Sequence, residues 1–318
     1  MPRSYISGET LDDVMREVYQ ELFECGEKIT ATKGDNLELT SVLLEIHNPR
    51  ARLSRTETRG KPFGCLGELC WYLARTNNVD FIAYYLKKYK EFEEDGVVFG
   101  GYGPRLFNWE GVNQYSSVVE LLRRKRRSRR AVIQLFDAQD IAGEHKDVPC
   151  TCSLQFMIRH DKLDLHVSMR SNDAFIGLAH DVFCFTMLQE IMANDLSVDL
   201  GRYTHVVGSL HLYEEHRDAA RQFLLEGWQS RTSPMPPMPK GDPWPPVRKL
   251  LEAEQQIRES GKLQGAILSE VDPYWGDLIR LLQIHRYAKE KNRASIEEVL
   301  NKMSSSVFDP YIKNRTSR

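Results

Sequence analysis

Residues 147–195 read DVPCTCSLQFMIRHDKLDLHVSMRSNDAFIGLAHDVFCFTMLQEIMAND, and this stretch decides the fold class. Residues 152–160 and 162–170 alternate apolar with polar side chains on either side of Asp161, as a β-hairpin with one face on a core does. Residues 174–195 follow as a long apolar run, which indicates a helix buried nearly all round. A half-buried hairpin beside a buried helix predicts an α+β fold.

Elements of both kinds are expected on either side of this stretch. Apolar side chains at helical spacing indicate helices, and β-branched or alternating runs indicate strands. Upstream we expect a helix over 10–28, a strand over 40–49, helical segments over 64–89, a glycine-rich turn region over 93–107, a helix over 117–125 and a strand over 131–136. Downstream we expect a strand over 203–213 and a helix over 214–228.

A proline-dense segment, SPMPPMPKGDPWPP at 233–246, divides the chain. Such a composition favours a linker or an extended wrap across the surface. Beyond it, three amphipathic stretches predict a helical C-terminal extension. We therefore expect a catalytic domain over 1–232, a linker over 233–246, and an extension over 247–318 that packs on the catalytic domain.

Composition narrows the function classes. The formal net charge of -2 over 318 residues argues against a dedicated duplex nucleic-acid binder, whose positive face would make the balance basic. No run of about 18 apolar residues indicates a membrane span, so we expect a soluble, cytoplasmic protein. Six scattered cysteines in a chain of this size favour reduced thiols over disulfides. Cys150 and Cys152 are spaced for neither a zinc knuckle nor a redox pair, and we expect no metal.

Five blocks in order carry a family resemblance. They are GELCWYL at 67–73, GGYGPRL at 100–106, DVPCTCSLQF at 147–156, RSNDAFIGLAHD at 170–181 and YTHVVGSLHLYEEH at 203–216. Together they resemble the thymidylate synthase family over roughly residues 60–216. The resemblance implies a large mixed sheet that is covered by helices on one side and forms a homodimer interface on the other.

Cys150 matches the family nucleophile. Carbon 5 of a pyrimidine is a poor nucleophile until a thiolate adds to carbon 6, so covalent catalysis comes first. A free thiol is mostly protonated at neutral pH and needs nearby positive charge. Arg170 matches the family arginine that supports both the thiolate and the nucleotide phosphate. The alternative is that Cys150 is one more buried small hydrophobe.

Glu68 and Tyr102 match the family's proton-handling residues. Glu68 stands among apolar residues, where an unpaired carboxylate is expensive. The family glutamate organises water and protonates the one-carbon carrier or the base, and we expect burial to raise the pKa of Glu68. A glutamate on an exposed helix stripe and an ordinary core tyrosine are the alternatives.

The resemblance also implies a nucleotide-binding set. Arg129 and Arg130 match paired arginines that reach across the dimer interface to the partner's phosphate; the alternative for RRKRRSRR is a solvated basic loop. Four further residues match groups that contact the phosphate, the base or the sugar 3'-hydroxyl. These are Ser171, Asp173, His211 and Tyr213.

Position 181 departs from thymidylate synthases, which carry an asparagine there that pairs with N3-H and O4 of uracil. Cytosine presents the opposite edge, and Asp181 can accept from N4 while sharing a proton with N3. The family's cytidylate hydroxymethylases carry an aspartate here. Asp181 therefore favours cytosine, unless it is a tolerated variant that faces a lysine or water.

Other departures concern the water network and the folate. Thr151 replaces the family histidine after the nucleophile. Tyr84, Tyr85 and Tyr89 stand where the family has a folate-stacking tryptophan, and the chain lacks the short apolar tail that closes over the folate. A poorly sealed site admits water, which favours a hydroxymethyl over a methyl product.

The main hypothesis is therefore a cytidylate 5-hydroxymethylase that acts on CMP or dCMP with 5,10-methylenetetrahydrofolate as co-substrate. A thymidylate synthase or cytidylate methylase is the second reading. A non-catalytic nucleotide-binding protein is the third. The residues leave open ribose against deoxyribose and the role of the C-terminal helices.

Overall fold

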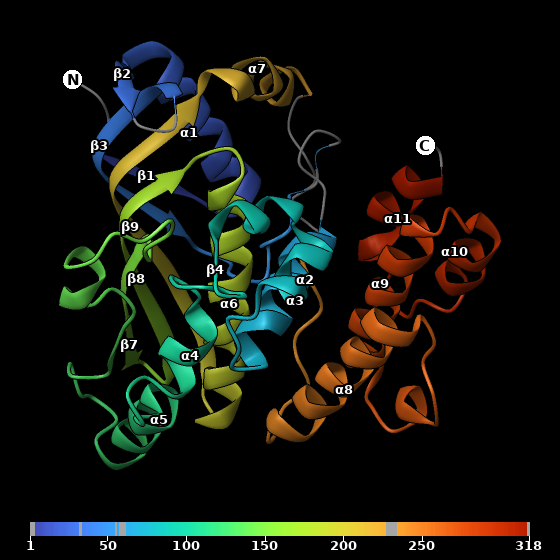
Figure 1. The fold of residues 1–318 in the computed structure, drawn as a ribbon. Coiled ribbons are helices and arrows are strands. Elements are labelled where there is room, and N and C mark those ends of the chain that lie inside the picture. Colours follow the sequence, from blue (N-terminus) through green and yellow to red (C-terminus); the bar gives the residue numbers. More distant parts are fainter. Residues whose placement is uncertain (1–3, 32–33, 55, 57–61, 227–233, 317–318) are drawn as a thin grey trace.

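The computed structural model describes residues 4–31, 34–54, 56, 62–226 and 234–316. Its centre is a seven-stranded sheet in the order β1-β3-β9-β8-β7-β6, with β2 paired to β3 (Figure 1). The strands are β1 (Tyr5–Gly8), β2 (Glu27–Ala31), β3 (Gly34–Ile46), β6 (Val132–Gln134), β7 (Thr151–Arg159), β8 (Lys162–Asp173) and β9 (Asp199–Tyr213). The pairs β1/β3 and β8/β9 are parallel and the rest antiparallel, so the mixed sheet is confirmed.

The predicted hairpin is β7–β8. His160 and Asp161 form its turn, and both have positive φ, 50° and 56°. Two successive residues in this region are the signature of the two-residue turn that matches strand twist. The turn therefore uses one residue more than the sequence suggested.

The predicted buried helix is α6 (Gly177–Asp195), in which every residue from Val182 to Asn194 is buried. It packs on β8 and β9, while α1 (Leu11–Cys25) packs on β1 and β3. Thr10 caps α1 in a capping box with Asp13. These two helices cover one face of the sheet.

A second layer of helices covers α6. It contains α2 (Pro62–Leu73), which lies on α6, and α3 (Val79–Tyr85), with α4 (Tyr102–Phe107), α5 (Gln114–Arg124) and α7 (Arg217–Leu225) around the rim. A small hairpin of β4 (Glu93–Glu94) and β5 (Val97–Val98) precedes α4. The expected helices over 64–89 and 117–125 are confirmed within a few residues.

The C-terminal helices stand to the right in Figure 1, and two of them pack on α2. They are α8 (Trp244–Ser260), α9 (Pro273–Lys289), α10 (Arg293–Leu300) and α11 (Asp309–Thr316). Residues 234–243 of the proline-dense segment form an extended wrap, because Met235 and Met238 are buried and their N–H groups donate to Arg50 O and to Glu190. The linker expected over 233–246 ends earlier than predicted, since α8 begins at Trp244. The boundary expected at 232/233 lies outside the described residues.

Among the described residues, no helix is long and apolar enough to span a bilayer.

Candidate active site

Cys150 immediately precedes β7 and lies beside Arg170 of β8. The Arg170 backbone N–H donates to Cys150 O (2.9 Å), and its Nη2 lies 3.7 Å from Cys150 Sγ. The guanidinium also donates to Pro149 O (3.0 Å) and Val148 O (3.1 Å), which fixes it next to the sulfur. A fixed cation at this distance stabilises a thiolate. A register shift between Thr151 and Ser153 marks a bulge at the start of β7, a device that re-aims a side chain.

Tyr102, at the first turn of α4, lies next to the nucleophile's strand. Its hydroxyl oxygen accepts from the Thr151 backbone N–H (3.1 Å) and so keeps its own proton for another acceptor. Burial, with the nearby Asp181 and Cys150, raises the pKa of Tyr102 well above its ordinary value. Tyr102 is therefore a neutral phenol between these two groups.

Glu68 is buried on α2 and is held by three hydrogen bonds. Its Oε1 accepts from Tyr72 Oη (3.1 Å) and Tyr89 Oη (2.6 Å), and its Oε2 lies 2.7 Å from His180 Nδ1. Tyr89 reaches it from the short 3₁₀ helix Lys87–Phe92, and His180 from the first turn of α6. Three segments thus converge on one carboxylate.

The expectation that Glu68 has a raised pKa is wrong. Burial raises the pKa, but the hydrogen bond and charge of His180 and the two tyrosine hydroxyls outweigh it, so the pKa of Glu68 is lowered. Burial lowers the pKa of His180, but Cys65 and Glu68 raise it to about 10. The two side chains therefore form an ion pair at neutral pH.

Asp181 follows His180 on α6, and its pKa is raised whereas that of Glu68 is lowered. Burial of its carboxyl and the charge of Glu68 raise the pKa of Asp181 to about 8. The residue keeps some exposed surface, although protein encloses the carboxyl. Asn172 Nδ2 donates to Asp181 Oδ2 (2.6 Å). Gly177 leaves room for this amide, since a Cβ at position 177 would lie 3.2 Å from its nitrogen. At neutral pH Asp181 is mostly a neutral acid, with one O–H to donate and one carbonyl to accept.

The nucleotide-binding candidates on β8 and β9 are adjacent. Asp173 pairs in register with His211, and Ser171 with Ser209. Asp173 Oδ1 accepts from two backbone N–H groups at the start of the turn into α6, so it is held rigidly. The His211 and Tyr213 rings meet edge to face, 4.9 Å apart. Burial, and then the charges of Asp173 and Cys150, raise the pKa of Tyr213.

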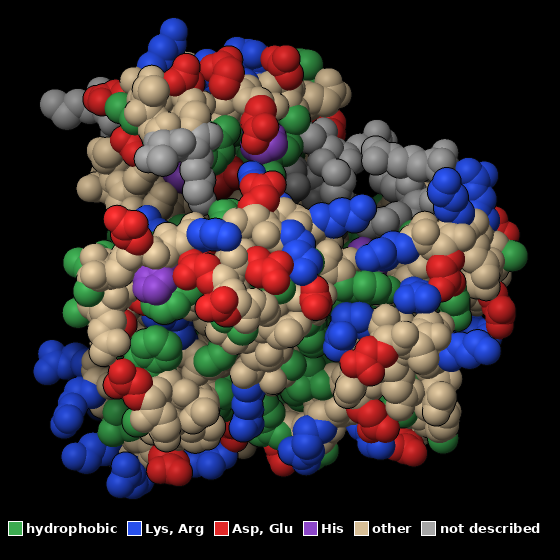
Figure 2. Space-filling view, viewed as in Figure 1, with side chains coloured by type: hydrophobic (Ala, Val, Ile, Leu, Met, Phe, Trp, Pro, Cys, Tyr) green, Lys and Arg blue, Asp and Glu red, His purple; other side chains and the backbone are tan. Residues whose placement is uncertain are grey.

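Arg129 and Arg130 are not brought to this cluster within the protomer. Both are exposed, in the loop between α5 and β6, and Arg129 O accepts from Gln155 Nε2 (2.9 Å). Gln155 is five residues along β7 from Cys150, or roughly 16 Å at strand spacing. Figure 2 shows Lys and Arg side chains gathered at the lower left of the view, in the region of α5.

Two of the three tyrosines expected to stack on folate are engaged elsewhere. Tyr85 Oη donates to Glu254 of α8 (2.9 Å), and Lys289 of α9 lies 3.6 Å from the centre of the Tyr84 ring. Tyr89 donates to Glu68. The C-terminal extension therefore covers Tyr84 and Tyr85.

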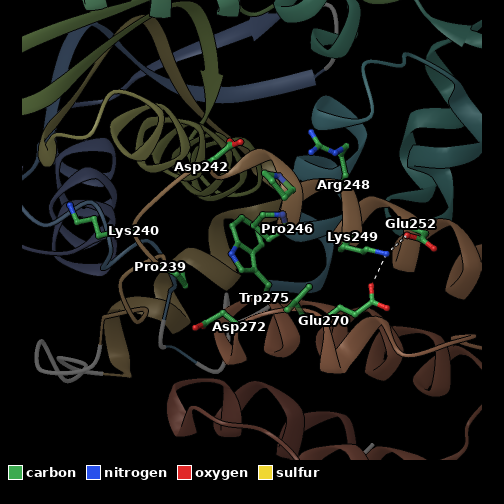
Figure 3. A pocket seen from close by; sticks show the side chains of 12 residues that line it. Pro239, Lys240, Asp242, Pro246, Arg248, Lys249, Glu252, Glu270, Asp272 and Trp275 are labelled. Carbon is green, nitrogen blue, oxygen red and sulfur yellow. Dashed lines mark hydrogen bonds and ion pairs between the residues drawn. The ribbon is translucent and has the colours of Figure 1, made fainter.

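A surface cavity of about 620 Å³ lies away from this cluster, between the proline-dense segment and the helices α8 and α9 (Figure 3). Its lining includes none of the predicted site residues. Lys249 pairs there with Glu252 and Glu270, and Lys240 pairs with Asp199. Both lysines of its lining are thus engaged in ion pairs. In the described part of the chain, no group of three His, Cys, Asp or Glu side chains could hold a metal ion.

Sequence reasoning missed three residues of the cluster: Tyr72, His180 and Asn172. Tyr72 lies inside the quoted block at 67–73, and His180 and Asn172 lie inside the block at 170–181. The available signal was a histidine next to an aspartate at the apolar start of a buried helix, a position where a polar side chain needs a partner.

Comparisons with known proteins agree with this geometry. Residues 49–237 match the family model described as thymidylate synthase. A deoxyuridylate hydroxymethyltransferase of Bacillus phage SP01 is 33% identical over 201 residues, covering 58% of this chain and 52% of that protein. One of Pseudomonas phage M6 is 32% identical over 163 residues, covering 50% and 46%. A thymidylate synthase of Francisella philomiragia is 27% identical over 175 residues, covering 49% and 63%. The chain thus spans about half the length of the hydroxymethyltransferases that it matches.

Proposed function

The chain belongs to the thymidylate synthase family, and from that premise we propose that it is a pyrimidine nucleotide 5-hydroxymethylase acting on the cytosine of CMP or dCMP. The supporting observation is that the carboxyl of Asp181, whose pKa is raised to about 8, is mostly neutral at neutral pH and lies near Tyr102. Its O–H matches the N3 acceptor of cytosine and its carbonyl matches the N4 amino group. Because Asn172 donates to Oδ2, the proton belongs on Oδ1.

Each residue has a role in this proposal. The Cys150 thiolate, supported by Arg170, adds to carbon 6 and makes carbon 5 nucleophilic. Tyr102 and Glu68 handle protons near carbon 5. The remaining residues bind the nucleotide: Arg129, Arg130, Arg170, Ser171, Asp173, His211 and Tyr213.

The one-carbon unit would come from 5,10-methylenetetrahydrofolate as co-substrate, a property of the family. The covered rings of Tyr84 and Tyr85 do not fit a folate-stacking role, so its ring would rest on other groups. Water as the final reactant gives a hydroxymethyl product. The relatives named hydroxymethyltransferases support that outcome.

A second candidate substrate is deoxyuridylate, which the names of the same relatives favour. A neutral carboxyl with its proton on the other oxygen complements the edge of uracil. The difference between the two substrates thus lies in which oxygen of Asp181 carries the proton, the one that faces N3 or the one that faces the group on carbon 4.

We propose that the active form is a homodimer joined through the sheet. Opposite the face packed by α6, half-exposed side chains form a row across four strands: Leu43, Val206, Ser168 and Ser153. A sheet face of this kind normally packs on a second layer. Pairing across it would let Arg129 and Arg130 reach the partner's phosphate. In this scheme residues 247–318 form an extension that packs on the catalytic domain.

The test is incubation of the protein with methylenetetrahydrofolate and each of CMP, dCMP, UMP and dUMP labelled with tritium at carbon 5. Tritium release with a hydroxymethylcytidylate product supports the proposal. Release from deoxyuridylate alone favours the second candidate, and a methyl product refutes the hydroxymethylase assignment.

A further inference from the structure

The neighbours of Glu68 leave it one free acceptor position. An ionised carboxylate has about four lone-pair sites. Among the described residues three are filled, two on Oε1 by Tyr72 and Tyr89 and one on Oε2 by His180. The remaining site suits one water molecule.

The His180 imidazole lies in a close-fitting space against α2. Its side chain is 12% exposed and lies against Gly64 of α2, where a Cβ would be 3.1 Å from the ring carbon Cε1. The missing side chain at position 64 leaves room for the ring against α2, one turn before Glu68. Two helices therefore fix both partners of the 2.7 Å contact, which is the length of a charge-assisted hydrogen bond.

Without His180, burial would dominate the electrostatics of Glu68. Tyrosine hydroxyls donate hydrogen bonds but carry no charge, and a buried carboxylate without a charged partner takes up a proton. The groups that face His180 are Glu68 and Cys65 on α2 and Asp181 on its own helix. Since Asp181 is neutral at neutral pH, Glu68 is the carboxylate charge that His180 balances.

We propose that His180 is a positioning residue that keeps Glu68 ionised and oriented as the base for the water that completes the hydroxymethyl group. The inference rests on the proposed function. In this step the water oxygen bonds to the methylene carbon attached at carbon 5, and the water proton passes to Glu68. The electron pair of the methylene double bond moves into the ring, and its return expels the Cys150 thiolate from carbon 6.

Two substitutions at position 180 separate charge from packing. His180→Phe keeps a ring of similar shape but has no group that can donate a hydrogen bond to Glu68. His180→Asn keeps an N–H near the position of Nδ1 but carries no charge. In His180→Phe we expect kcat on the acid limb of the pH profile to fall about tenfold and to recover as the pH rises. The acid limb of the pH profile should move up by about one unit or more, the usual effect of burial on an unpaired carboxyl. His180→Asn should be intermediate, and nucleotide affinity should stay near the wild-type value in both.

His205→Phe is the matched control. His205 is fully buried on β9, and its hydrogen bond is to Tyr203 rather than to a carboxylate. The same change there should leave the shape of the pH profile unaltered. If His180→Phe does not fold, His180→Asn and Gly64→Ala, which crowds the imidazole, must show the shifted acid limb.

The outcomes separate this inference from the proposed function. If the wild type converts a pyrimidine nucleotide but the position-180 variants keep its pH profile at a uniformly lower rate, His180 is structural and the inference fails. If the wild type converts none of the four nucleotides, the proposed function fails and this step fails with it.

Discussion

At the residue scale, the proposed reaction depends on one sulfur, that of Cys150, and Cys152 nearby provides the control. Cys150→Ser should abolish tritium release while nucleotide binding persists, because the change removes the attacking thiolate but few binding contacts. Cys152→Ser, at a half-buried position two residues along the chain, should retain turnover. Activity in the Cys150 variant, with isothermal titration showing a bound nucleotide, would contradict the covalent mechanism.

Asp181 is expected to set the base preference. In Asp181→Asn, the amide gives a hydrogen bond to O4 and takes one from N3-H, whereas cytosine would place its N4 amino group against an amide donor. Each mismatched buried group costs about 1–3 kcal/mol, so relative kcat/KM should move toward the uridylates roughly ten- to a hundredfold. Carbon 5 tritium release from the four nucleotides measures this. Equal loss on all four would mean that Asp181 does not read the base.

The same residue predicts a pH dependence. The pKa of Asp181 is raised to about 8, so the neutral form that pairs with cytosine is lost as the pH rises through that value, and cytidylate turnover should fall. Asp181 also makes the free energy of unfolding depend on pH in the same direction. Its stabilising contribution is fully present below the ordinary pKa of 3.8 and is lost as the pH rises to about 8. Thermal unfolding of Asp181→Asn should therefore show less decline over this interval. Asp173→Asn, which keeps the capping oxygen, should decline as the wild type does.

At the element scale, the C-terminal extension acts on α2 through Tyr85. A Cβ at Gly67 would lie 2.1 Å from the Tyr85 ring, and Glu254 of α8 holds that ring by its hydroxyl. Gly67→Ala should destabilise the protein by about 1–3 kcal/mol or more, because a rigid ring cannot retreat. Gly276→Ala in α9, whose Cβ would meet only the flexible Arg280 guanidinium, is the control. If Gly67→Ala and Gly276→Ala had the same unfolding midpoint in denaturant, α8 would not clamp α3 against α2.

The elements that the sequence predicted well are those with strong apolar patterns. The β7–β8 hairpin, α6 and β9 alternate or run apolar because they face the core, and the structure confirms them. The edge strands β1 and β2 were missed, and β3 was predicted six residues short at its start. Their sequences, YISG, EKITA and GDNLELT, are largely polar because these segments lie at the exposed edge of the sheet.

The site was predictable as residue identities but only partly as chemistry. Motif order was enough to select Cys150, Arg170, Glu68 and Asp181. The sign of the Glu68 pKa shift could not be read from the motif, because it depends on His180 and Tyr89 from other segments as well as on Tyr72 of the same helix. Tertiary contacts between distant segments decide such electrostatics, and a single sequence does not display them.

At the scale of the whole molecule, the position of the basic loop bears on the proposed homodimer. Arg129 and Arg130 are exposed and roughly 16 Å of strand from Cys150, so their own site is a poor target. Removing both should lower nucleotide affinity by roughly 2–4 kcal/mol if they contact a phosphate. Arg126→Ala with Arg127→Ala in the same loop is the control; Arg126 pairs with Asp161 of the β7–β8 turn.

Mixed dimers test whether the arginines act across the interface. Cys150→Ser should be inactive alone, and Arg129→Ala/Arg130→Ala should be nearly inactive at a nucleotide concentration that saturates the wild type but not this variant. In a two-fold dimer that shares arginines, a hybrid has one site with both defects and one site with an intact thiol and intact arginines. Random mixing should therefore restore about one quarter of wild-type activity. Adding Val206→Arg on the sheet face to both chains should separate the protomers and abolish the recovery, as sedimentation would show. No recovery from dimers that do form would assign the arginines to their own subunit or to no site, because a shared site cannot stay inactive when one complete set of residues is present.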